Sequence, residues 1–265
     1  MRTELQSTPP TRGLDLPPNI IDTLVNFFQT QTTQRGFRRV VYGLSGGVDS
    51  AVVALLCQKV FQNNAHALLM PSLSTPSSAL EHATELCKAF QIPVSHHPIA
   101  PHHALFKDRH KDANLIRQGN FCARLRMATL YDYALEHHAL VIGTSNKSER
   151  LLGYGTIFGD LACAINPIGN LYKSQIYALA RLLQVPENIL NKPPSADFYA
   201  GQSDEGELGF SYAEIDPLLL AMEQNPHLDF NALVALGFAP KLVASVQERM
   251  AKNAFKLEMP TICAL

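Results

Sequence analysis

The sequence lacks the features that mark several large classes of protein. Its five cysteines are an odd number and include no CxxC pair, which favours reduced thiols over a disulfide framework or a zinc site. It has no run of 18 apolar residues, so no membrane span is predicted. Residues 1–18 are polar and rich in proline, without the long apolar core of a signal peptide. These absences predict a cytoplasmic globular protein.

The chain also lacks an excess of charge of either sign. Its formal net charge of −1 at pH 7 gives no broad electrostatic reason to bind nucleic acid or an anionic membrane. With 265 residues, 46% of them hydrophobic, it is large enough for one sizeable α/β domain. We expect a single domain over residues 1–265, with a loose segment at 1–18 and a helical C-terminal part at 211–265.

A glycine-rich loop lies early in the chain, in the segment "VVYGLSGGVDSAVV" at residues 40–53. It has neither the Lys-Ser/Thr pair of a Walker-type loop nor a GxGxxG dinucleotide fingerprint. Gly46 and Gly47 let backbone N–H groups approach a ligand closely, and Ser45 and Ser50 add hydroxyl donors. An apolar helix follows the loop, and a helix N-terminus favours an anion. The loop therefore has the composition of an anion-binding site.

Asp49 is the exception in this loop, because a carboxylate repels phosphates. Its position is explained if a divalent cation lies between the carboxylate and the phosphates. The loop thus predicts a nucleotide polyphosphate bound with magnesium. The alternative interpretation is a simple glycine turn between a strand and a helix, with a solvated Asp at the helix N-terminus.

Strand-like runs alternate with helix-length stretches over the first 150 residues. This order predicts an α/β fold, a doubly wound parallel sheet with helices on both faces. Ligands bind such sheets at the carboxyl ends of the strands, near the point where strand order reverses. The loops after Leu44, Met70 and Thr144 are therefore expected to share one crevice. The expected strands lie at 38–44, 65–70, 92–99 and 139–144, and expected helices include 19–36, 76–90 and 114–137.

Two irregular stretches, 150–170 and 195–209, interrupt the pattern in the second half of the chain. Long irregular stretches in compact domains are usually functional or disordered. The helices expected around and after them lie at 173–183, 211–223, 230–236 and 239–251.

Four further charged residues could carry chemistry. Glu149 follows an expected strand end, and with Asp49 it would give two oxygen ligands for one magnesium if the two strands are neighbours. A carboxylate in a first helical turn is also favourable for dipole reasons alone. Lys173 begins a helix, where a cation is unfavourable unless an anion faces it, so it is either a phosphate contact or a solvated lysine. Arg124 and Arg126 lie two residues apart on a helix, so at most one readily faces a given ligand.

The motif "GLSGGVDS" resembles the ATP loop of the N-type ATP-pyrophosphatases. These enzymes activate an oxygen with AMP, release pyrophosphate and let a nitrogen nucleophile displace the AMP. Within that superfamily, residues from about 19 to 260 resemble the NAD synthetases, and the ordered set of motifs is specific to them. The resemblance implies an adenine nucleotide alpha hydrolase-like, Rossmann-like fold. The motifs are "LLMPS", "GNFCARLRM", "LVIGTSNKSE", "GYGTIFGD", "NPIGNLYKSQ", "KPPSAD", "GQSDEGELGFSY" and "FKLEMP".

By this resemblance the enzyme is a ligase that performs the last step of NAD biosynthesis. The carboxylate of deamido-NAD attacks the α-phosphate of ATP, and ammonia converts the adenylate to the amide. The motifs imply that Asp49 and Glu149 hold Mg²⁺, that Arg124 and Lys256 bind deamido-NAD, and that Asp160 orients or deprotonates ammonium. Asp49, Glu149, Asp160 and Lys173 are then the catalytic set. The implied ATP contacts are Gly43, Leu44, Ser45, Gly46, Gly47, Val48, Asp49, Ser50, Thr144, Lys173 and Ser195.

The sequence departs from many ammonia-dependent relatives at two positions. Where those relatives have a Lys in a "TKYGDG" loop and an Asp shortly after, this chain has Ile157 and Ala164, a pattern closer to the synthetase module of glutamine-dependent enzymes. The ATP loop nevertheless begins at Gly43, with no room for a preceding glutaminase domain, so ammonia is the expected nitrogen source. Relatives are homodimers with the deamido-NAD site at the subunit interface, and helix 114–137 is the candidate interface.

Two other classes of function compete with this interpretation. A tRNA-modifying thiolase or ligase of the same superfamily predicts a basic surface and often reactive paired cysteines, and the sequence has neither. A non-catalytic adenine-nucleotide sensor would not need Asp49, Glu149 and Lys173 together, nor two long irregular loops.

Overall fold

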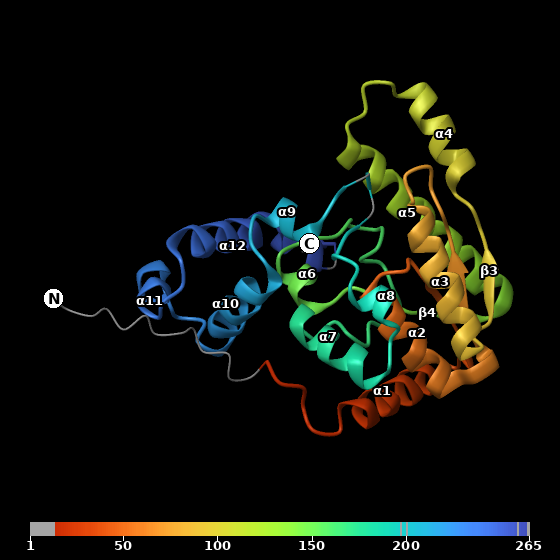
Figure 1. Ribbon diagram of the computed structural model, residues 1–265, viewed down its shortest axis with the longest axis horizontal. Helices are drawn as coiled ribbons and strands as arrows, with labels where there is room; N and C mark the ends of the chain where they lie inside the picture. Colours follow the sequence, from red (N-terminus) through yellow and green to blue (C-terminus); the bar gives the residue numbers. More distant parts are fainter. Residues whose placement is uncertain (1–13, 197, 200, 259, 264–265) are drawn as a thin grey trace.

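The computed structural model describes residues 14–196, 198–199, 201–258 and 260–263, so most of the expected loose segment 1–18 lies outside the described residues. The fold is built on a four-stranded parallel sheet with the strand order β3-β2-β1-β4, and helices cover both faces (Figure 1). The predicted doubly wound parallel sheet is confirmed. The strands are β1 (Arg39–Gly43), β2 (Ala65–Leu69), β3 (Val94–His96) and β4 (Ala139–Val141).

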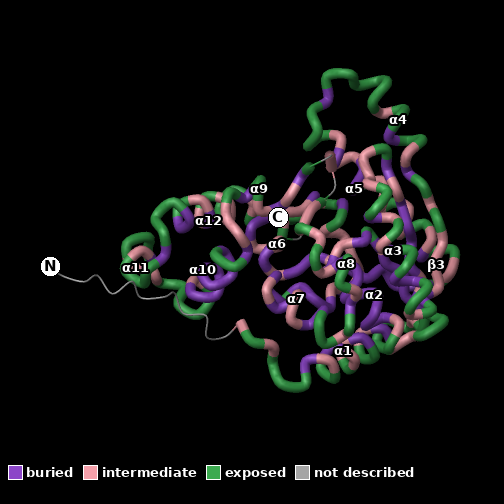
Figure 2. Tube along the Cα trace, viewed as in Figure 1, coloured by how far each residue is buried: buried purple, intermediate pink, exposed green. Residues whose placement is uncertain are grey.

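The strands β2, β1 and β4 are largely buried on both faces (Figure 2), which explains why they read as nearly continuous apolar runs, whereas the edge strand β3 is partly exposed. Successive side chains of a strand point to opposite faces. Val40 and Tyr42 accordingly lie in one hydrophobic cluster, and Val41 lies in another on the opposite face. The first cluster is covered by α1 (Ile20–Gln34), α2 (Val48–Phe61), α3 (Ser77–Phe90) and α7 (Lys173–Leu182), and the second by α5 (Leu115–His137).

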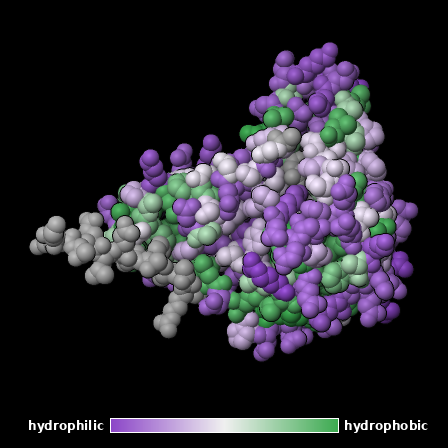
Figure 3. All heavy atoms as spheres, in the orientation of Figure 1, coloured by the Kyte–Doolittle hydropathy of each residue, from purple (hydrophilic) through white to green (hydrophobic). Residues whose placement is uncertain are grey.

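The C-terminal helices pack around a third hydrophobic cluster, to one side of the sheet (Figure 1). This cluster also takes in Leu152 and Tyr172, which flank the two helices that follow β4. Hydrophobic side chains gather over this part of the surface, whereas the projecting region of α4 is mostly hydrophilic (Figure 3). These helices are α10 (Tyr212–Gln224), α11 (Phe230–Ala235) and α12 (Pro240–Asn253), and the remaining elements are η1 (Gln62–Asn64), α4 (Ala100–Arg109), α6 (Lys147–Leu151), α8 (Glu187–Leu190), α9 (Asp204–Leu208) and η2 (Ala254–Leu257).

The structure corrects two of the expected element boundaries. The strand expected at 139–144 ends at Val141, and Ile142 then forms only an isolated parallel bridge to Ile165. The stretch 195–209 is not wholly irregular, because it contains α9. The Ser203 side chain caps α9 by accepting a hydrogen bond from the Gly206 N–H, and acidic residues fill the first turn. A five-residue helix is too short to leave an apolar period in the sequence.

The strand order reverses at β1, which has β2 on one side and β4 on the other. In open α/β sheets a ligand crevice forms outside the carboxyl ends of the strands at such a point. The condition for pairing Asp49 with Glu149, that their strands be neighbours, is therefore met. Within the described part of the chain, the helices are all too short or too polar to cross a membrane.

Candidate active site

A cavity of about 460 Å³ opens at the carboxyl ends of the strands. Leu44, Met70 and Thr144 all line it, which confirms the prediction that the loops after these residues share one crevice. Further parts of its wall come from residues 153–160 and 192–196 and from α5, α9 and α12. The cavity thus has the location and size of a small-molecule site.

The glycine loop between β1 and α2 forms one wall of this cavity. The Ser50 Oγ donates to the Gly47 carbonyl at 2.9 Å and lies 3.0 Å from the Ser45 Oγ, so the two hydroxyls hold the loop closed on itself. Gly47 is the N-cap residue of α2, and no side chain caps this helix end. The first N–H groups of α2 therefore face the cavity as donors for an anion.

Gly46 has no room for a side chain. Its φ of +79° is in the left-handed region, and a Cβ there would lie 2.1 Å from the carbonyl oxygen of Ala79 in α3. The loop is thus packed directly against the backbone of α3, and only glycine fits at this position.

Three charged side chains meet beside this loop. The Lys173 Nζ lies 2.5 Å from the Asp49 Oδ2 and 3.0 Å from the Glu149 Oε1, and Lys173 is only 2% exposed. Burial alone would lower the pKa of Lys173, but the two carboxylates outweigh it and hold this pKa well above its ordinary value. Lys173 is therefore a buried ammonium between two carboxylates, which rules out the alternative of a solvated lysine. We call Asp49, Glu149 and Lys173 the charged triad.

Asn146 orients both carboxylates of the charged triad. Its side-chain N–H donates to the Asp49 Oδ1 at 2.8 Å, and its backbone N–H donates to the Glu149 Oε2 at 3.3 Å. Its Oδ1 accepts from the Glu149 N–H, which completes a capping box at the start of α6. Each carboxylate thus has one oxygen fixed by Asn146 and the other on Lys173.

Asp160 lines the cavity and lies in the irregular stretch 150–170. Its Oδ1 accepts from the Thr156 N–H at 2.9 Å, and the Thr156 hydroxyl in turn donates to the Asn120 side chain of α5 at 2.6 Å. The Lys256 ammonium donates to the carbonyls of Gly153 and Gly155. The loop that carries Asp160 is therefore held from both sides.

The structure brings most of the predicted ATP contacts to the cavity. Thr144 and Ser195 line it together with the glycine loop, and the predicted deamido-NAD contact Lys256 lines it as well. Arg124 is different: it is exposed on α5 and does not line the cavity, whereas Arg126 does and donates to the Met70 carbonyl at 3.1 Å. A contact of Arg124 with deamido-NAD would require a site at a subunit interface, so that assignment stays a prediction.

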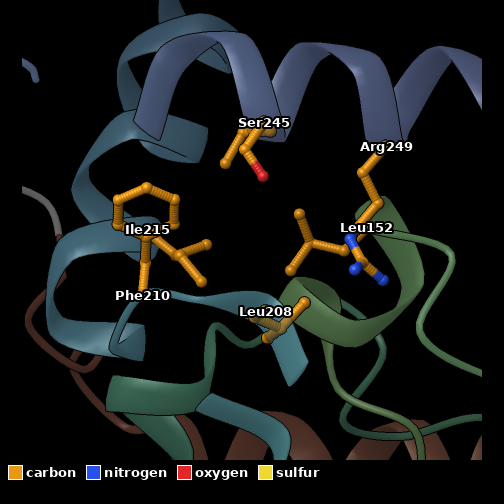
Figure 4. A pocket seen from close by; sticks show the side chains of 7 residues that line it. Leu152, Leu208, Phe210, Ile215, Ser245 and Arg249 are labelled. Atoms are coloured by element: carbon orange, nitrogen blue, oxygen red, sulfur yellow. The ribbon is translucent and has the colours of Figure 1, made fainter. Parts of the chain in front are cut away.

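The sequence did not predict several of the polar cavity residues, among them Asp204, Arg249 and Asn253. Asp204 of α9 is 3% exposed, and burial raises its pKa. Arg249 and Asn253 of α12 also line the cavity. Arg249 borders a second pocket as well, where it extends from α12 toward Leu152 (Figure 4). Asp204 lies in a stretch without apolar periodicity, so the sequence did not indicate that it belongs to a helix that lines the cavity. Arg249 and Asn253 lie four positions apart around the C-terminal end of an expected helix, shortly before Lys256. Residues at this spacing share one face of a helix, and this was the signal that could have placed them together.

A sequence model of the NAD synthase family matches residues 20–260. The chain belongs to the NAD synthase family. It is 58% identical over 247 residues to the NH(3)-dependent NAD(+) synthetase of Helicobacter pylori strain ATCC 700392 / 26695, covering 92% of this chain and 95% of that protein. It is 51% identical over 252 residues to the protein of the same name from Wolinella succinogenes, covering 93% and 95%.

Solved structures of NAD synthase relatives have the same fold. The NH3-dependent NAD synthetase from Campylobacter jejuni, in complex with the nitrate ion, has a TM-score of 0.79 and 43% identity, over 92% of this chain and 97% of that one. An NMN synthetase from Francisella tularensis has a TM-score of 0.83 and 33% identity, over 95% and 100%. NH(3)-dependent members of the NAD synthase family are ligases that convert deamido-NAD to NAD with ATP and ammonia.

Proposed function

We propose that this chain amidates deamido-NAD in the cytoplasm, using ATP and ammonia, at the cavity between β1 and β4. The observation that carries the proposal is the charged triad beside a glycine loop whose helix end is uncapped. A deamido-NAD carboxylate oxygen bonds to the α-phosphorus as the bond to the β-phosphate oxygen breaks and pyrophosphate leaves. Ammonia then bonds to the carbonyl carbon of the adenylate, and AMP leaves.

The glycine loop and Lys173 are proposed to hold the ATP phosphates. Residues 43–50 present backbone N–H groups and hydroxyls at the N-terminus of α2, and Thr144 and Ser195 line the same cavity. Lys173 supplies a fixed positive charge where negative charge accumulates on the departing pyrophosphate. Such a prearranged charge needs no reorganisation during the reaction, which is the main source of its catalytic effect.

Asp49 and Glu149 are proposed to hold Mg²⁺. Magnesium is commonly bound by one or two carboxylates, with substrate phosphates and water completing the shell. The chemistry of these two side chains fits that role, because both are carboxylates beside the glycine loop, with one oxygen of each on the Lys173 ammonium and the other on Asn146. Among the described residues, no group of three or more His, Cys, Asp or Glu side chains is placed to hold a metal, so the phosphates would have to complete the shell. When bound, the ion would neutralise phosphate charge.

Deamido-NAD is proposed to bind at a homodimer interface. Arg124 is exposed on α5, on the outside of the cavity wall, which is where a second subunit could reach it. Lys256 and Arg126 lie on the cavity side and would face the same dinucleotide.

A turnover assay tests the proposed reaction. The purified chain is mixed with ATP, Mg²⁺ and either ammonium or glutamine, with deamido-NAD or nicotinate mononucleotide as the acceptor. We expect NAD and AMP in equal amounts from deamido-NAD and ammonium. NMN formed in preference to NAD would instead match the Francisella relative and replace the proposed substrate. No AMP with either acceptor would favour a nucleotide sensor.

Asp160 is proposed to orient and deprotonate ammonium, which is the main form of ammonia at neutral pH. Asp160→Asn should lower kcat/KM for ammonium by roughly 100-fold, the usual effect of losing a general base. Because adenylation does not use ammonia, ATP–pyrophosphate exchange in the presence of deamido-NAD should change little. The rate of NAD formation is measured from pH 6 to 9 alongside the exchange rate. An unchanged NAD-forming rate across that range would exclude both roles for Asp160.

A further inference from the structure

Asp216 is a buried carboxylate that the proposed reaction does not use. It lies on α10, in the C-terminal helical part, and is 0% exposed. Its Oδ1 accepts from the Ser148 hydroxyl at 2.6 Å, and its Oδ2 accepts from the Ser174 N–H at 2.8 Å. The Ser148 Oγ also accepts from the Lys173 N–H at 2.9 Å. One carboxylate thus joins α6, which carries Ser148, to the first two residues of α7.

These bonds are made to the immediate neighbours of the charged triad. Ser148 precedes Glu149 on α6, and Ser174 follows Lys173 on α7. The backbone of Lys173 is therefore held from behind by Ser148 and Asp216, while its ammonium reaches forward to the carboxylates. The separation of α6 from α7 decides how far Glu149 lies from Lys173, and Asp216 bridges that separation.

The carboxylate also explains how a lysine can begin a helix. A cation at a helix N-terminus is unfavourable, and an anion there is favourable. Asp216 places its negative charge on the Ser174 N–H in the first turn of α7, and the Tyr172 N-cap residue supplies no negative charge there. Removing a buried carboxylate from such a position leaves its donors without partners.

A second carboxylate on the same face of α10, Glu223, also contacts both α6 and the start of α7, but nearer the surface. Glu223 lies seven residues after Asp216, two helical turns along. It binds the Lys147 ammonium of α6 at 2.5 and 2.6 Å and accepts from the hydroxyl of Tyr172, the N-cap residue of α7, at 2.9 Å. Its side chain is 49% exposed, so solvent weakens this outer pair. α10 therefore holds α6 and α7 at two points, of which the inner one is buried.

We propose that Asp216 is a positioning residue, which fixes α6 against α7 and so holds Glu149 and Lys173 at the separation that ATP activation requires. The inference rests on the proposed function of the charged triad. It assigns to the C-terminal helices a role in the first half-reaction, although Asp216 itself does not line the cavity.

The test compares two changes in the inner contact with a control on the same helix. Asp216→Asn keeps the shape of the side chain but loses its charge and presents an N–H₂ group in place of one acceptor. Ser148→Ala removes only the bridging hydroxyl and serves if Asp216→Asn fails to fold. Glu214→Ala is the control, because Glu214 accepts from the N–H and hydroxyl of Ser211 at the start of α10, away from the charged triad.

We expect both inner variants to lower kcat/KM for ATP by about 10- to 100-fold, since displacement of a catalytic group by about 1 Å has an effect of that size. KM for deamido-NAD should change by less than about twofold, because that site is not displaced. Acetic anhydride labelling of Lys173, followed by mass spectrometry under native conditions, should become faster in both variants. Glu214→Ala should match the wild-type chain in both measurements.

Unchanged kcat/KM for ATP together with unchanged Lys173 labelling in both inner variants would overturn the proposal. A fall in kcat that only follows the loss of folded protein, with both KM values intact, would also overturn it. The labelling does not depend on turnover. If the wild-type chain formed no AMP, the proposed function would fail, and the labelling would still decide whether Asp216 positions Lys173.

Discussion

Replacing Lys173 by methionine should lower kcat/KM for ATP by at least about 1,000-fold, a loss typical of removing a prearranged charge from an active site. The same change should reduce the free energy of unfolding by about 3–5 kcal/mol, because it leaves Asp49 and Glu149 buried without their cation. Steady-state kinetics and urea denaturation measure the two effects separately. Lys59→Met, on the exposed side of α2, is the matched control and should change neither.

The stability loss from Lys173→Met should depend on pH in a definite direction. Burial raises the pKa of Glu149 to about 8 although the ammonium of Lys173 opposes that rise, and loss of the ammonium should raise this pKa further. Without the ammonium, the folded protein holds a proton on Glu149 that the unfolded chain releases, so stability should decrease as the pH rises above the ordinary Glu range. Adding Glu149→Gln to the variant should remove most of this dependence. A Lys173→Met variant that is as stable at pH 8 as at pH 5 would contradict the assignment.

The second large effect is expected for Gly46→Ala. A Cβ at this position would lie 2.1 Å from the Ala79 carbonyl oxygen, and φ is +79°. The backbone conformation alone costs about 1–2 kcal/mol for a non-glycine residue, and overpacking adds about 1–3 kcal/mol. We expect the glycine loop to move away from α3, with kcat/KM for ATP falling by at least about 100-fold. Thermal unfolding and ATP-dependent turnover measure the two consequences.

Gly47→Ala is the matched control for the stability part of this prediction. Gly47 has a φ of −95°, and a Cβ there would lie 3.4 Å from the Ser45 Oγ, close to an ordinary contact. We expect its thermal unfolding to stay within a few degrees of the wild-type chain. If Gly46→Ala were as stable as Gly47→Ala, the close packing of the glycine loop on α3 would not constrain this position.

Local patterns in the sequence were sufficient to predict the parallel sheet and one wall of the candidate active site. The glycine loop lies between a β-branched run and an apolar helix, and Glu149 follows the next strand to join the sheet beside β1. Right-handed crossovers and parallel pairing then bring Asp49 and Glu149 to the same edge. The unfavourable position of Lys173 at a helix N-terminus correctly indicated that anions face it.

The remaining parts of the site could not be predicted, because they depend on contacts between distant segments. Asp204 and Asp216 come from the part of the chain beyond residue 200, and nothing in their local sequence indicates that they lie near Lys173. Arg126 lines the cavity and Arg124 does not, and helix spacing, which only sets the two side chains on different faces of α5, could not indicate which face is turned to the cavity. Arg249 faces the cavity only because α12 packs on the cluster around Leu152.

The pairing of β1 with β4 also bears on how the protein forms during synthesis. Arg39 pairs with Ala139, and the Lys173–Asp49 contact joins residues 124 positions apart. Contacts of such long range form late in folding, since the chain between them must first be ordered. A nascent chain in which the glycine loop has been synthesised but α7 has not therefore contains the phosphate-binding sequence without Lys173, and so without a complete site. ATP would then bind only the completely folded protein. Because a ligand stabilises only the state that binds it, ATP could not stabilise the partly synthesised chain.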